Sequence, residues 1–182
     1  RDRHLEEIRR TPPPAGQVGV GVVTRQHRRQ RREELFGLRD QGVEVHVLGE
    51  LDRLDEETRK AVEAICTGTV GGSALRLNLM ISYSGRSELI RAVRGIARDA
   101  AAGSLDPADV DEAELERRLF TAGLPDPDLL IRTSGEQRLS NFLLWQLAYT
   151  EIHTSPVLWP DFTRDDFALA LQDYAGRHRR FG

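Results

Sequence analysis

A short apolar segment that ends in a basic loop constrains the fold of this chain most. Residues 125–128 read Pro-Asp-Pro-Asp and force a turn, and Leu129–Ile131 is an apolar run typical of a strand buried on both faces. Arg132 then lies at the carboxyl end of that strand. In open α/β sheets, ligands bind at the carboxyl ends of the strands. The sequence therefore predicts an α/β fold with a ligand site after residue 131.

The loop after this strand carries groups that suit a phosphate. Residues 133–135, which end in Gly135, are small, and their backbone N–H groups can approach an anion closely. Arg138 follows, and a guanidinium binds phosphate oxygens bidentately and stays charged at physiological pH. The Ser140 hydroxyl can donate to the same anion beside a helix start. Together these residues predict a diphosphate site.

A helix is predicted from Asn141 onward, with Ser140 as its candidate N-cap. Ser140, Leu144, Leu147 and Glu151 fall at i, i+4, i+7 and i+11, on one face of such a helix. An unbroken helix would place Ser140 and Glu151 about 16 Å apart. We therefore expect the two residues to serve different parts of a site.

Residues 132–151, with their flanks 121–128 and 158–162, are very similar to the cis-prenyltransferases, the undecaprenyl diphosphate synthase family. This resemblance implies transfer of an allylic prenyl group onto isopentenyl diphosphate, with a new Z double bond at each addition. It also implies an Mg²⁺-assisted site without a redox cofactor. The fold it implies is a single α/β domain with a central, mainly parallel sheet flanked by helices.

The resemblance also assigns roles to single residues. Arg132, Arg138 and Ser140 match the family's ligands for isopentenyl diphosphate, and Gly135 lies in the same substrate loop. Glu151 matches the family's acidic residue implicated in metal binding, and a carboxylate suits Mg²⁺, which takes a few oxygen ligands plus diphosphate and water.

The last three residues resemble the family's Arg-x-Gly tail. They read Arg180-Phe181-Gly182, and in the family this tail reaches across a dimer to the neighbour's diphosphate site. The resemblance therefore assigns Arg180 and Gly182 to substrate binding, in a homodimer or a heterodimer. A frayed basic terminus is the alternative interpretation.

The family's Asp-Gly-Asn-x-Arg-Trp loop, whose Asp works with Mg²⁺, does not occur in this sequence. No catalytic residue is identified for that reason, and we expect residues 1–182 to form one domain that is incomplete at its N-terminus. The family's tunnel-wall helix is also short here, with few residues between Leu35 and Gly42. Residues 82–88 resemble the Asn-Tyr-Gly-Gly-Arg segment with Ser82 and Ser84 as replacements, so a ligand contact and a plain turn both stay open.

Other segments read as ordinary α/β elements. Residues 43–49 and 75–81 alternate or run apolar like strands, and residues 51–57 predict the opening of a helix. Residues 100–104 read as a helix end.

Charge and composition exclude several classes of protein. The chain has 26 basic and 29 acidic side chains, a net charge of −3, which argues against a general nucleic-acid binder. The arginines of residues 25–32 form a basic run, which is a solvated helix face or a contact for lipid headgroups, substrate or nucleic acid.

Cys66 is the single cysteine, so no internal disulfide forms, which suits a reducing cytosol. No apolar stretch predicts a membrane span, so any membrane contact is peripheral.

The sequence thus predicts a Z-prenyl chain-elongating transferase that uses isopentenyl diphosphate, an allylic diphosphate and Mg²⁺. Two alternatives stay open: a non-catalytic accessory subunit of a heteromeric cis-prenyltransferase, and a basic-patch protein that binds lipid or nucleic acid. Retention of Arg132, Arg138, Ser140 and Glu151 together weighs against the accessory subunit, which typically has lost much of this site.

Overall fold

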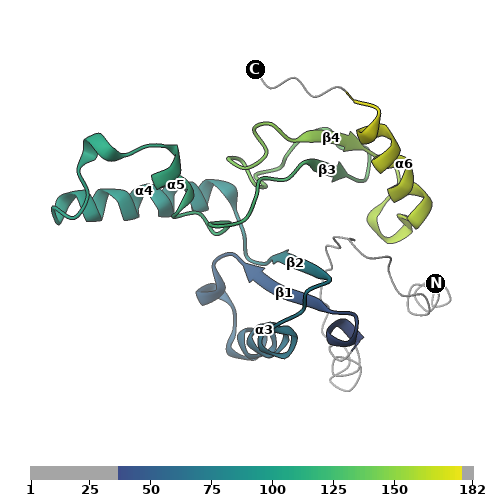
Figure 1. Ribbon diagram of the computed structural model, residues 1–182, viewed down its shortest axis with the longest axis horizontal. Helices are drawn as coiled ribbons and strands as arrows, with labels where there is room; N and C mark the ends of the chain where they lie inside the picture. The colour runs from purple at the N-terminus through teal and green to yellow at the C-terminus, as the bar shows by residue number, and fades with distance from the viewer. Residues whose placement is uncertain (1–36, 178–182) are drawn as a thin grey trace. The chain divides into compact units, whose positions relative to one another are not determined.

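The computed structural model describes residues 37–177 of the 182-residue chain (Figure 1). Predictions on residues 1–36, including the basic run, and on Arg180 and Gly182 lie outside the described residues. The chain divides into two compact units, one ending at Tyr83 and one beginning at Ser84, and each is described by itself. In each unit two strands pair in parallel and a helix packs against one of them, so the predicted α/β fold is confirmed. Within residues 37–177, no helix is long and apolar enough to cross a membrane.

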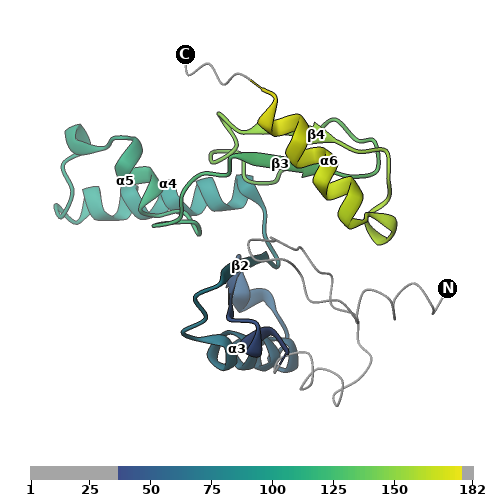
Figure 2. The same cartoon turned by 45° about the vertical axis from the view of Figure 1, so that its right-hand side comes forward.

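The described part of the first unit contains a parallel strand pair joined by a helix. Strand β1 (Val43–Leu48) pairs with β2 (Leu75–Met80) in register, from Val43 opposite Leu75 to Leu48 opposite Met80. The connecting helix α3 (Glu56–Thr69) begins after Asp55, whose side chain accepts a hydrogen bond from the Thr58 amide, and it packs on β1 (Figures 1 and 2). The two strands and the helix start are therefore confirmed.

Buried valines and a close approach between two backbone segments stabilise this unit. The alternating Val43 and Val45 of β1 are buried, and the Val45 amide donates to the Thr69 hydroxyl at 3.0 Å. That hydroxyl in turn donates to the Ile65 carbonyl at 2.8 Å, which ties the end of α3 to β1. After β1 the chain turns at Gly49, where φ is +137° and a Cβ atom would lie 2.0 Å from the Ile81 carbonyl oxygen. Only glycine fits there.

The second unit combines a long helix with a second strand pair. Its longest helix, α4 (Gly85–Ala101), ends where the sequence predicted a helix end, and α5 (Glu112–Glu116) packs beside it. Strands β3 (Leu129–Arg132) and β4 (Glu151–Thr154) pair in parallel, and α6 (Arg164–Ala175) lies against β4 (Figure 2). Short 3₁₀ turns complete the two units at η1 (Leu51–Arg53), η2 (Pro107–Asp109) and η3 (Trp159–Asp161).

The predicted helix from Asn141 to Glu151 is wrong. Residues 141–149 form successive turns instead, and Glu151 is the first residue of β4. The reason lies in the backbone at the predicted helix start. Ser140, Asn141 and Leu143 have φ values of +51°, +64° and +43°, in the left-handed region that a right-handed helix cannot contain.

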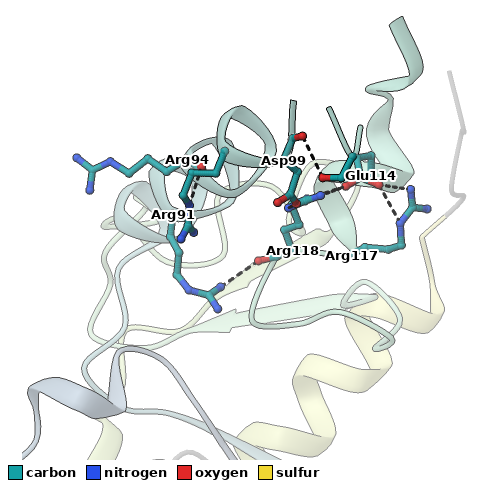
Figure 3. Close-up of polar contacts among 8 residues, drawn as sticks. Arg91, Arg94, Asp99, Glu114, Arg117 and Arg118 are labelled. Carbon is teal, nitrogen blue, oxygen red and sulfur yellow. Dashed lines mark hydrogen bonds and ion pairs between the residues drawn. The ribbon is translucent and has the colours of Figure 1, made fainter. Parts of the chain in front are cut away.

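A network of arginines and carboxylates joins α4 to α5 (Figure 3). The buried Glu114 carboxylate pairs with both Arg117 and Arg118. Arg118 also donates to Asp99 of α4 at 2.6 Å, and the Arg91 guanidinium donates to the Arg118 carbonyl at 3.1 Å. Because the Glu114 carboxylate holds Arg118, whose guanidinium also reaches Asp99 of α4, the packing of the two helices depends on the charge of Glu114.

We predict that Glu114→Gln flattens the acid dependence of stability. Hydrogen bonds from Arg117 and Arg118 hold the pKa of the Glu114 carboxyl below its usual range. A depressed pKa stabilises the folded chain at pH values above the unfolded pKa of about 4.3, and this contribution is lost as the pH falls through the folded value. Urea unfolding followed by circular dichroism between pH 3 and 7 should therefore show a steeper acid loss in the wild type than in the variant.

Glu112→Gln, on the same helix, is the matched control because Glu112 is exposed. It should follow the wild-type curve. If stability falls equally with acid in the wild type and in Glu114→Gln, the Glu114 carboxyl does not have a depressed pKa in the folded chain.

Candidate anion site

The predicted ligand loop begins at the carboxyl end of β3, as expected from the sequence. Three backbone hydrogen bonds hold its first half against the segment after β4: Ser155 N–H to the Arg132 carbonyl, Ser134 N–H to the Val157 carbonyl and Gly135 N–H to the Ser155 carbonyl, all at 2.8 Å. Ser134 and Gly135 both have left-handed φ values, +71° and +68°. The chain therefore reverses sharply directly after the strand, and Gly135 accommodates this turn at no steric cost.

These bonds correct one expectation about the loop. The amides of Ser134 and Gly135 were expected to be available to a phosphate, but both donate to backbone carbonyls. These two amides are therefore not available to an anion in this arrangement. Gly135 acts through its backbone conformation.

Two arginines converge on one carboxylate at this loop. The Glu136 side chain pairs through Oε2 with Arg132 and through Oε1 with Arg138, the latter at 2.6 Å. The Arg132 side chain is 33% exposed and that of Arg138 is 70% exposed. A carboxylate held between two guanidinium forks occupies the type of position that a diphosphate would take, because both anions accept the same charge-assisted hydrogen bonds.

Ser140 lies beside the same arginine. Its hydroxyl oxygen is 3.5 Å from Arg132 Nη2, at the long limit of a hydrogen bond. Ser140 does not cap a helix, because its backbone is left-handed and no helix follows. The buried Nε of Arg132 has no hydrogen-bond partner among residues 37–177. Arg132 therefore retains a donor that the loop itself does not use.

Glu151 lies at the amino-terminal end of the β3–β4 pair, whereas Arg132 lies at its carboxyl end. It is opposite Leu129 in the register, whereas Arg132 is opposite Thr154. The Glu151 carboxylate accepts from Arg177 at 2.8 Å, and the same guanidinium pairs with Asp173 at 2.6 Å. The structure thus brings Arg132, Arg138 and Ser140 together and leaves Glu151 apart.

The described residues do not by themselves fit a magnesium site. Between residues 37 and 177, no group of three or more His, Cys, Asp or Glu side chains could hold a metal ion. The carboxylate assigned to the metal, that of Glu151, is bound by a guanidinium. An Mg²⁺ ion prefers several oxygen ligands in octahedral geometry, so one arginine-paired carboxylate is not sufficient.

Residues 82–88 form the turn that leads into α4. The Ser84 side chain caps this helix by accepting from the Ser87 amide at 3.3 Å. Arg86 is exposed in the first turn, and its amide donates to the Asn141 side chain at 2.8 Å. The turn interpretation therefore accounts for the geometry of this segment.

Sequence reasoning missed two residues of the site, Glu136 and Asn141. The spacing of Glu136, four residues after Arg132 and two before Arg138, is a local signal for a bridging carboxylate. The contacts of Asn141 lie more than fifty residues away in sequence, at Ser84 and Arg86, and leave no local pattern.

Comparison with known proteins identifies the family. Residues 20–182 match the family model described as putative undecaprenyl diphosphate synthase, and the chain belongs to this family. The isoprenyl transferase of Heliobacterium mobile is 48% identical over 149 residues, which are 82% of this chain and 57% of that protein. The isoprenyl transferase of Geobacillus kaustophilus is 50% identical over 142 residues, 78% of this chain and 55% of that protein. The chain thus spans a little over half the length of these relatives.

Two solved structures share the fold. Lavandulyl diphosphate synthase from Lavandula x intermedia, in complex with dimethylallyl diphosphate, has a TM-score of 0.80 and 38% identity over 84% of this chain and 66% of that one. A probable undecaprenyl diphosphate synthase from Campylobacter jejuni has a TM-score of 0.70 and 34% identity over 85% of this chain and 70% of that one. The predicted family and fold are both confirmed.

We predict that Glu136→Gln binds inorganic pyrophosphate more tightly than the wild type, by about two- to fivefold, the range of an exposed ion pair. An incoming anion must displace the Glu136 carboxylate from Arg132 and Arg138. The neutral amide competes less for the guanidiniums. Isothermal titration calorimetry measures the change.

Glu112→Gln removes the same charge from α5 and serves as the control, which should leave the affinity near the wild-type value. Weaker binding by Glu136→Gln would mean that the carboxylate acts mainly to orient the arginines.

Proposed function

We propose that this chain binds isopentenyl diphosphate as part of a Z-prenyl chain-elongating transferase, which joins that substrate to an allylic prenyl diphosphate. The convergence of Arg132 and Arg138 on Glu136 at the carboxyl end of β3 carries the proposal. Two converging guanidiniums can bind an anion, and they lie at the carboxyl end of a strand, where open α/β proteins bind ligands. The similar lavandulyl diphosphate synthase, solved with dimethylallyl diphosphate, supports the substrate class.

In this proposal the described residues bind and orient the acceptor. Arg132 and Arg138 hold the diphosphate of isopentenyl diphosphate, the Ser140 hydroxyl donates to it, and Gly135 sets the loop conformation. Fixing the diphosphate aims the alkene of the acceptor at the allylic carbon, which lowers the entropic part of the barrier. The remaining part of the barrier is charge separation as diphosphate leaves the allylic donor, which nearby cations reduce.

No described residue is assigned to that ionisation step. The Asp-Gly-Asn-x-Arg-Trp loop that the family uses is absent from this sequence. Turnover by these residues alone is therefore expected to be weaker than their binding of isopentenyl diphosphate. The accessory-subunit alternative shares this expectation and is separated from the enzyme by assay.

Mg²⁺ is proposed as the cation that accompanies the diphosphate substrates, with Glu151 as the candidate protein ligand. Mg²⁺ is commonly bound by one or two carboxylates together with substrate phosphates and water. Glu151 would first have to leave Arg177.

A dimer is also proposed, with Arg180 and Gly182 contributing to the neighbouring diphosphate site. An apolar face of α4 supports it: Ile90 and Val93 lie three residues apart on this helix and are 52% and 53% exposed. The proposal covers both a homodimer and a heterodimer.

Because short prenyl diphosphates dissolve in water and long products partition into bilayers, we also propose that the enzyme acts in the cytoplasm, in peripheral contact with the membrane.

We predict that Arg138→Ala weakens isopentenyl diphosphate binding by about 1.5 to 3 kcal/mol, the range for a hydrogen bond to a charged group. The Arg138 side chain is exposed, so its loss should not unfold the chain. Calorimetric titration with isopentenyl diphosphate measures the affinity, and circular dichroism reports the fold. Arg94→Ala, which removes an exposed arginine from α4 (Figure 3), is the control and should bind normally. Unchanged affinity in Arg138→Ala would exclude Arg138 from the site.

A prenyl-transfer assay separates the enzyme from the accessory subunit. The purified chain is incubated with labelled isopentenyl diphosphate, farnesyl or geranyl diphosphate and Mg²⁺, alone and mixed with an active family member. We expect no product from the chain alone, because the Asp loop is absent, and no enhancement in the mixture. Product from the chain alone would mean that another residue replaces the Asp loop. Enhanced product in the mixture would favour the accessory subunit.

A further inference from the structure

Asn141 joins the end of the anion loop to the start of α4. Its side-chain Oδ1 accepts from the Arg86 amide at 2.8 Å, and its Nδ2 donates to the Ser84 hydroxyl at 2.8 Å. Its backbone carbonyl accepts from the Gly85 amide at 2.9 Å. One residue thus makes three hydrogen bonds to three consecutive residues at the N-terminus of another element.

These contacts satisfy amides that the helix leaves without intrahelical partners. The first N–H groups of an α-helix need external acceptors. In α4 the amides of Gly85 and Arg86 donate to Asn141, and the amide of Ser87 donates to Ser84. Asparagine suits this position because its amide both donates and accepts, and because it tolerates the left-handed φ of +64° observed here.

The packing around Gly85 holds the two segments at short range. A Cβ atom at Gly85 would lie 2.9 Å from Leu144 Cγ and 3.2 Å from the Asn141 carbonyl oxygen. The backbone of α4 therefore approaches residues 141–144 more closely than a side chain would allow. Even a small displacement of residue 141 would break the hydrogen bonds to Gly85 and Arg86.

We propose that Asn141 is a positioning residue for the anion site, an inference that rests on the proposed function. The first half of the loop is held by the amides of Ser134 and Gly135, and Asn141 holds its second half. Arg138 and Ser140 lie between the two attachments. The Arg138 side chain is 70% exposed and pairs with Glu136, a residue of the same loop, so the backbone of the loop determines where both groups stand.

The test is a calorimetric titration of the full chain with isopentenyl diphosphate and with inorganic pyrophosphate. Asn141→Gly keeps the left-handed backbone accessible and removes both side-chain hydrogen bonds. We expect both ligands to bind at least about tenfold more weakly, because misplacing a binding group by about 1 Å has effects of this size or larger. Ser84→Ala removes the other end of one contact without changing the loop sequence, and should weaken binding in the same direction.

A matched control separates positioning from general loss of stability. Ala170→Gly weakens α6, where Ala170 is fully buried, without touching the loop or α4. It should lower the thermal unfolding temperature and leave both affinities unchanged. If Ala170→Gly weakens binding as much as Asn141→Gly does, the effect is general destabilisation and the inference is overturned.

The double variant tests whether the two residues act through their mutual contact. If they do, Ser84→Ala adds less to Asn141→Gly than it costs alone, whereas additive losses would overturn the inference. By the reciprocity of coupled sites, bound pyrophosphate should also slow hydrogen exchange at the Gly85 and Arg86 amides. Unchanged exchange with ligand bound would count against the coupling.

The outcomes distinguish this inference from the function on which it rests. If wild-type chain binds neither ligand, the proposed function fails. If the wild type binds both and Asn141→Gly binds them equally well, the proposed function stands and the positioning role of Asn141 is overturned.

Discussion

Two backbone hydrogen bonds determine where the chain goes after β3. The amides of Ser134 and Gly135 donate to carbonyls beyond β4, so the chain reverses at once and does not continue the strand. Everything that follows in the loop is positioned relative to this turn. The cost is that two amides which could have bound an anion are used for structure. The positive charge at this loop comes from Arg132 and Arg138, which lie on both sides of the turn.

Arginines held close together repel each other unless an anion lies between them. In this loop Glu136 fills that role by pairing with both Arg132 and Arg138. The carboxylate keeps the guanidiniums convergent before any ligand arrives, which reduces the reorganisation needed for binding. It also competes with the ligand for the same N–H groups. A multiply charged diphosphate can displace a single carboxylate, whereas a weaker anion competes poorly, so Glu136 favours ligands of high charge.

The elements that the sequence predicted correctly are those with local causes. The strand at 129–132 follows a Pro-Asp-Pro-Asp turn, and α3 starts at a capping aspartate, Asp55. Asn141 shows where local reasoning fails. The apolar period after residue 140 is helical, but three left-handed residues interrupt it, and one of them, Asn141, is held by hydrogen bonds to the start of α4. A pattern within one segment does not contain the partner that overrides it. The convergence of Arg132 and Arg138 was predictable, and the bridging role of Glu136 was not foreseen.

The described residues proposed to hold isopentenyl diphosphate, Arg132, Arg138 and Ser140, belong to the compact unit that begins at Ser84. Their arrangement depends on β3, the turn after it and the start of α4. It does not depend on any group assigned to ionisation of the allylic donor. In the proposed function, binding of the acceptor and turnover are therefore separate physical properties. Binding requires a loop held at both ends, and turnover requires charge stabilisation at the allylic donor, so a change that removes one can leave the other intact.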